Sequence, residues 1–140
     1  MFKKIEKILL KYIPIFYLGL TRAQDSNDRF IFGSDIIKEF KNNNKLNVLD
    51  VGCGSGNFYA YLKSLSNELK YLGIEFNVNQ IKSSKFTEKN FNLKEKDLRK
   101  EWFFGEFDFV WSSEVIEHIK DDNLFFKKLV KSTKKEGYII

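Results

Sequence analysis

The sequence has a single cysteine, a single proline and a single histidine among its 140 residues. One cysteine excludes an intramolecular disulfide framework and, with no recognisable secretory signal, favours a reducing, cytoplasmic location. One histidine means that any imidazole acting as a general base must be His118. The longest apolar stretch, from Ile8 to Leu20, is too short for a transmembrane helix and is interrupted by Lys11 and Pro14.

Positive charge is only slightly in excess, with 24 Lys and Arg against 19 Asp and Glu. These lysines are scattered, whereas a dedicated nucleic-acid binder more often concentrates them on one face, so a nucleic-acid partner is not favoured. The basic, amphipathic residues 1–12 leave a peripheral membrane contact open, although such a segment more often packs on its own domain. The oligomeric state is also left open. An apolar fraction of 43% and a charged fraction of 31% are typical of one globular domain.

Two segments with different patterns divide the chain. Residues 1–45 are predicted to form an N-terminal helical segment, and residues 46–140 alternate between strand and helix patterns. Strands are expected at 46–51, 71–75, 91–95 and 107–112, with another beginning at 137; helices are expected from 58, at 78–86 and at 114–131, the last interrupted at 121–122. Alternation of this kind predicts an α/β fold with a doubly wound, Rossmann-like, mostly parallel sheet.

A glycine-rich loop follows the first predicted strand, in the run Val48-Leu49-Asp50-Val51-Gly52-Cys53-Gly54-Ser55-Gly56-Asn57-Phe58. Glycines there permit a sharp turn and the close approach of a nucleotide-like ligand. Glu75 ends the next strand, nineteen residues after Gly56, where a carboxylate can accept hydrogen bonds from ribose hydroxyls. A dinucleotide fingerprint would require glycine at position 57, which is Asn57. Asp50 would repel a pyrophosphate and would instead suit an ammonium group.

These motifs resemble those of class I methyltransferases that depend on S-adenosylmethionine, of the type 11 and 12 kind. Residues 48–56 are similar to the first motif of that family, and Gly73-Ile74-Glu75-Phe76 to its second-strand motif. Residues 107–119 resemble the fourth-strand motif of the branch that includes ubiquinone-biosynthesis O-methyltransferases. Family members usually continue through two further strands, so the resemblance implies a class I methyltransferase fold that lacks its last strands.

The resemblance also implies which residues bind the cofactor, S-adenosylmethionine. It places the glycine loop and Ser113 around the methionine end, Asp50 beneath it and Glu75 on the ribose. Phe76 and the pair Asp97 and Leu98 fall where the family contacts adenine. The implied cofactor-binding set is Asp50, Gly52, Cys53, Gly54, Gly56, Glu75, Phe76, Asp97, Leu98 and Ser113.

No catalytic residue is assigned, and His118 is the candidate for a base if the acceptor is a hydroxyl group. Glu114, Glu117 and His118 would share one face of a helix and are candidate metal ligands, although no metal is required. The expected function is methyl transfer to a small molecule by residues 46–140, an incomplete domain. The alternatives are a cofactor-binding remnant without catalysis, an RNA methyltransferase and, least favoured, an NAD-dependent enzyme.

Overall fold

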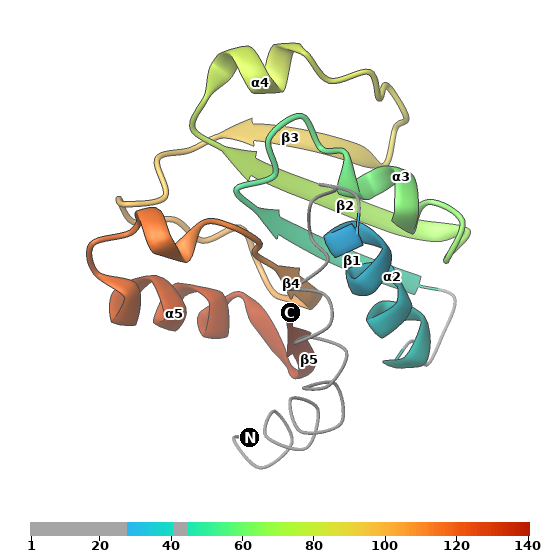
Figure 1. The fold of residues 1–140 in the computed structure, drawn as a ribbon. Helices are drawn as coiled ribbons and strands as arrows, with labels where there is room; N and C mark the ends of the chain where they lie inside the picture. The colour runs from blue at the N-terminus through green and yellow to red at the C-terminus, as the bar shows by residue number, and fades with distance from the viewer. Residues whose placement is uncertain (1–27, 41–44) are drawn as a thin grey trace.

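The computed structural model describes residues 28–40 and 45–140, and its centre is a five-stranded sheet (Figure 1). The strands are β1 (Lys45–Val51), β2 (Glu68–Glu75), β3 (Phe91–Glu95), β4 (Phe107–Trp111) and β5 (Thr133–Ile139). All neighbouring strands are parallel, and they lie in the order β3-β2-β1-β4-β5. The predicted doubly wound α/β class is therefore confirmed.

Side chains of β1 alternate between two cores, one on each face of the sheet. Leu46 and Val48 belong to one core, with residues of α2 (Asp28–Phe40) and α3 (Phe58–Leu62). Leu49 and Val51 belong to the other, with residues of α5 (Asp122–Lys131). The short helix α4 (Val78–Lys82) contacts β2 and β3. Helices thus cover both faces, as a parallel sheet requires.

The strand order reverses direction beside β1, and this reversal marks where a ligand site is expected in the sheet. From β1 the chain moves outward to β2 and β3, then returns to β4 and moves outward again to β5. The carboxyl ends of β1 and β4 therefore form a topological switch point, where open α/β sheets bind their ligands. Loops that leave β1, β2, β3 and β4 all open on this edge.

Several element boundaries differ from those that the sequence predicts. Strand β2 begins at Glu68 rather than Tyr71, because exposed and buried residues alternate over its first half. Helix α4 ends at Lys82 rather than Phe86. The next residue, Ser83, caps it, and its hydroxyl donates to the carbonyl of Gln80. Strand β5 begins at Thr133 rather than Gly137, because Thr133 already pairs with Phe107 of β4 before a shift in the register.

The predicted N-terminal helical segment is only partly described, as helix α2. The amphipathic residues 1–12 lie outside the described residues. Over the described ranges no helix is long and apolar enough to cross a membrane.

Candidate functional site

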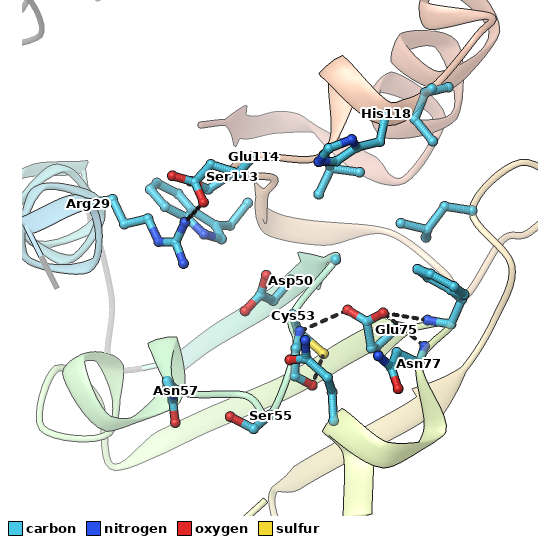
Figure 2. Close-up of a pocket in the computed structure, with 18 of the residues that line it drawn as sticks. Arg29, Asp50, Cys53, Ser55, Asn57, Glu75, Asn77, Ser113, Glu114 and His118 are labelled. Carbon is cyan, nitrogen blue, oxygen red and sulfur yellow. Dashed lines mark hydrogen bonds and ion pairs between the residues drawn. The ribbon is translucent and has the colours of Figure 1, made fainter. Parts of the chain in front are cut away.

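A pocket of about 710 Å³ opens at the switch point (Figure 2). That volume is in the range of small-molecule and cofactor sites. Nine of the ten predicted cofactor residues line the pocket: Asp50, Gly52, Cys53, Gly54, Glu75, Phe76, Asp97, Leu98 and Ser113. The side chains reach it from the ends of four strands, as expected for motifs placed after each strand.

The glycine loop after β1 is held against β2 by its backbone. The amides of Gly52 and Cys53 both donate to the carbonyl of Ile74, at 2.9 and 3.2 Å. Gly52 has a φ of +79°, and a Cβ atom there would lie 2.2 Å from a methyl group of Val115. Glycine is therefore required at this position by both conformation and space.

Gly56 departs from the prediction because it is not among the residues that line the pocket. Its φ is also +79°, but a Cβ atom there would lie 2.7 Å from the ring of Phe91. Gly56 thus permits close packing of the loop on the aromatic core, whereas Ser55 and Asn57 on either side of it line the pocket.

Asp50 lies at the end of β1, where its carboxyl group is buried and forms part of the pocket wall. The hydroxyl of Tyr71, on β2, donates a short hydrogen bond to its Oδ2 atom. Burial raises the pKa of Asp50 to about 7, against the lowering effect of this bond and of the Arg29 charge. Burial and the neighbouring Asp50 also raise the pKa of Tyr71, which keeps the phenol protonated. The pair is a buried acid that ionises near neutral pH.

Glu75 ends β2 and is fixed by three backbone amides (Figure 2). Its Oε1 atom accepts from Phe76 and Asn77, both at 2.9 Å, and its Oε2 atom accepts from Gly54 at 3.0 Å. A carboxylate oxygen has two lone pairs, so Oε2 keeps one for a hydroxyl group in the pocket. Glu75 therefore joins the glycine loop to the next loop and presents one free acceptor.

The loop after β3 forms a further part of the wall. Hydrogen bonds from the side chain and backbone of Arg99 lower the pKa of Asp97 to about 2, so its carboxylate is ionised. Leu98 is buried, and Phe76, which also lines the pocket, is 62% exposed. An exposed aromatic ring at a pocket wall is available to pack on a planar ligand.

The segment after β4 contradicts the shared helical face proposed for a metal. Glu114 has a φ of +56°, and the 3-10 helix η1 (Ile116–His118) begins only after it. Glu114 instead forms an ion pair with Arg29 of α2 (Figure 2). Within residues 28–40 and 45–140 no group of three acidic, cysteine or histidine side chains is placed to hold a metal ion. His118 lines the pocket and is exposed, so its role as a base stays a prediction.

Cys53 also lines the pocket, but its thiol is not activated. Burial, with the nearby carboxylates Asp50 and Glu75, raises the pKa of Cys53 well above its usual range. A protonated, buried thiol is a poor nucleophile. The structure therefore supports a packing role for Cys53 in the loop, as its small size suggests.

Two residues that shape the site escape the sequence analysis: Arg29, which lines the pocket, and Tyr71, which bonds Asp50 but is not itself among the lining residues. Arg29 lies on α2, 21 residues before Asp50, and no local motif marks it. Tyr71 does not follow a strand but lies within β2, directly beside Val48 of β1 in the parallel register. Only the sheet register, which the sequence does not state, brings the hydroxyl of Tyr71 to Asp50.

The family model described as a methyltransferase domain matches residues 49–140. The chain belongs to this family. Among curated proteins, "Putative methyltransferase 235L" of Invertebrate iridescent virus 6 is 26% identical over 90 residues, which are 64% of this chain and 34% of that protein.

Solved structures of methyltransferases share the fold. The plantazolicin methyltransferase BamL, in complex with a triazolic desmethylPZN analog and SAH, superimposes with a TM-score of 0.71 at 19% identity. That match covers 89% of this chain and 48% of BamL. Coclaurine N-methyltransferase, bound to N-methylheliamine and SAH, gives 0.66 at 20% identity over 84% of this chain and 37% of its own. This chain thus spans about a third to a half of the lengths of these three proteins.

The described residues fit S-adenosylmethionine, the cofactor that the sequence resemblance implies. The cofactor carries an ammonium group, two ribose hydroxyls and an adenine ring. The pocket offers a buried acid at Asp50, a free carboxylate lone pair at Glu75 and an exposed ring at Phe76. The pocket therefore offers side chains whose chemistry is complementary to these three groups.

Proposed function

We propose that this chain binds S-adenosylmethionine at the switch point and forms the cofactor-binding part of a methyltransferase that acts on a small molecule. The observation that carries the proposal is the pair of carboxyl groups in one pocket, Asp50 after β1 and Glu75 after β2. One suits the ammonium of a methionine moiety and the other a ribose. Family membership supports methyl transfer as the reaction.

Arg29 adds a second argument for a methionine moiety. Its guanidinium lines the same pocket as Asp50, and its charge acts on that carboxyl group. A pocket end with one cationic and one acidic side chain is complementary to an amino acid, which carries a carboxylate and an ammonium group. Arg29 would have to exchange its present partner, Glu114, for the cofactor carboxylate.

Methyl transfer needs little besides orientation, because a sulfonium methyl group is already activated for in-line displacement. The protein holds the donor and an acceptor close and aligned, which supplies much of the rate. His118 and Glu114, at the pocket wall after β4, are the side chains available to orient an acceptor or to take a proton from it. Fold alone does not decide the reaction, since the solved [4+2]-cyclase SpnF also matches, with a TM-score of 0.64.

Titration calorimetry with S-adenosylhomocysteine tests the cofactor site. Glu75→Gln should weaken binding at least tenfold, since it removes a charged acceptor at the ribose; a hydrogen bond to a charged group contributes about 1.5–3 kcal/mol. Glu68→Gln is the matched control, because Glu68 lies at the opposite end of the same strand and is exposed. Binding that is equal in the wild type and Glu75→Gln would refute the ribose assignment.

A second measurement separates ribose recognition from loop damage. The analogue that lacks the ribose 2′-hydroxyl should lose less affinity than S-adenosylhomocysteine when Glu75 is replaced. Transfer of labelled methyl from S-adenosylmethionine is then followed with phenols, amines and an RNA pool as acceptors. Labelling of a phenol or amine supports a small-molecule acceptor, whereas labelling of RNA alone, or binding without any transfer, would replace it with one of the alternatives.

A further inference from the structure

Lys128 is a lysine in the core, which is unusual for this residue type. It lies on α5 with 5% of its surface exposed, next to the buried side chains Phe125 and Leu129. A buried ammonium is costly unless polar groups replace its water. Its partners therefore indicate what the residue holds in place.

Those partners are backbone carbonyls of one loop, the loop that follows β3. The Nζ atom lies 3.4 Å from the carbonyl oxygen of Leu98, 3.5 Å from that of Arg99 and 2.5 Å from that of Lys100. The indole of Trp102 also donates to the carbonyl of Leu98, at 3.3 Å. In the part of the chain that the structure describes, no carboxylate forms an ion pair with Lys128. The carbonyl dipoles of the loop therefore stabilise the positive charge of the buried ammonium.

The same loop faces the pocket with its other side. Asp97, Leu98 and Arg99 line the pocket, and the amide of Lys100 closes the turn by donating to the carbonyl of Asp97 at 3.1 Å. Figure 1 shows α5 beside the segment that connects β3 to β4. The side chain of Lys128 thus lies outside the pocket and contacts the backbone of a loop that forms part of the pocket wall.

We propose that Lys128 is a positioning residue, which holds the loop 97–100 in the conformation that receives the adenine end of the cofactor. It acts through three consecutive carbonyls, so it sets the loop backbone and, with it, where the carboxylate of Asp97 lies. This role rests on the proposed cofactor site. Lys128 itself is not among the pocket residues.

The global stability of a neutralised variant separates a positioning role of Lys128 from a purely structural one, because only the loss of a structural residue should lower it. Lys128→Met keeps the length of the side chain and removes the buried charge, a change that is often neutral or stabilising in a core. Arg99 and Lys100 are exposed, so water can reach that turn once the ammonium is gone. Lys128→Met should therefore leave the global stability nearly unchanged and loosen the loop.

Amide hydrogen exchange without any ligand tests the loop directly. In Lys128→Met the amides of Arg99 and Lys100 should exchange at least tenfold faster than in the wild type, while amides of β1 remain unchanged. Lys127→Met is the matched control, because Lys127 is the neighbouring residue on α5 and is exposed. Unchanged exchange at both loop amides would overturn the proposal, whether or not the chain binds a cofactor.

Ligand discrimination tests the consequence for the pocket. S-inosylhomocysteine carries a carbonyl oxygen in place of the adenine amino group, so it lacks the exocyclic amino donor from which Asp97 would accept. We expect Lys128→Met to weaken S-adenosylhomocysteine about tenfold and S-inosylhomocysteine by less than threefold, and Lys127→Met to change neither. Equal losses for both ligands, or no loss, would overturn a positioning role.

The two readouts keep separate the failure of this proposal and the failure of the proposed function. If the wild type binds no S-adenosylhomocysteine, the cofactor assignment fails, and hydrogen exchange still decides what Lys128 does to the loop. If Lys128→Met does not fold, Lys128→Gln replaces it, since its uncharged amide ends one atom short of the position of Nζ and so cannot hold the three loop carbonyls. The same limits apply to that variant.

Discussion

The buried carboxyl group of Asp50 makes stability and cofactor binding depend on pH in opposite directions, and Asp50→Asn tests this. Burial raises the pKa of Asp50 from 3.8 to about 7 in the cofactor-free protein. The folded state therefore binds a proton that the unfolded chain has already released above pH 4. The associated stability is fully present below that pH and is lost as the pH rises through 7.

The magnitude follows from the two pKa values. Linkage predicts that the wild type loses about 2 kcal/mol of unfolding free energy between pH 5.5 and pH 7.5 through this group. Asp50→Asn preserves the size of the side chain and an oxygen that accepts from Tyr71, but it cannot ionise. Urea unfolding, followed by tryptophan fluorescence at both pH values, gives the difference between the two proteins, in which other titrating groups largely cancel.

Cofactor affinity should change in the opposite sense, because an ammonium group requires the ionised carboxylate. With a pKa of about 7 in the free protein, the affinity for S-adenosylhomocysteine should rise about 25-fold between pH 5.5 and pH 7.5. Asp50→Asn should bind more weakly at pH 7.5 and lack this rise. The remaining pH dependence of the variant measures the other groups of the pocket.

Two results would refute the reasoning. A wild type whose unfolding free energy changes with pH as that of Asp50→Asn does would show that the carboxyl group is already ionised in the folded protein at pH 5.5. An affinity that falls as the pH rises would mean that Asp50 faces the ligand as an acid rather than as a carboxylate.

Three further substitutions test the surroundings of the pocket. Gly52→Ala places a Cβ atom against Val115 at a φ of +79° and should lower the unfolding free energy by about 2 kcal/mol or more in urea titrations; a loss under about 0.5 kcal/mol would contradict the clash. Tyr71→Phe removes the hydrogen bond that lowers the pKa of Asp50, so the midpoint of pH-dependent binding should move above 7, and a lower midpoint would contradict this. Arg29→Met should weaken S-adenosylhomocysteine about tenfold but leave its decarboxylated analogue nearly unaffected; equal losses in calorimetry would remove the carboxylate assignment.

The cofactor loop could be predicted from the sequence because its determinants are contiguous. A buried strand, a turn that requires glycine and the next strand's terminal acid lie within residues 46–75, and parallel strands bring their carboxyl ends to one edge. The pocket residues after β3 and β4 came instead from the family resemblance, and the structure places Asp97, Leu98 and Ser113 in the pocket lining. The closeness of Gly56 to Phe91 could not be predicted, since it depends on how the loop packs on the sheet.

The rest of the pocket depends on tertiary contacts that local patterns do not encode. Arg29 reaches the pocket because α2 packs on α3, where Phe30 stacks on Phe58. The predicted helical face from Glu114 to His118 does not form, because Glu114 adopts a left-handed conformation outside the short 3-10 helix. A spacing of three and four residues gathers side chains only where a helix is continuous.

Helix α2 is attached to the rest of the protein by two kinds of contact that respond differently to solvent. At the pocket wall it is held by the ion pair of Arg29 with Glu114, whose side chains are 31% and 69% exposed. Nearer its middle, Gly33 lets the ring of Trp111 approach the helix backbone closely, and this contact involves no charge. Dissolved salt screens an exposed ion pair and leaves apolar packing intact. Ionic strength therefore weakens the contact of the helix at the pocket wall and leaves its attachment to the core unchanged, so two parts of one helix respond to salt differently.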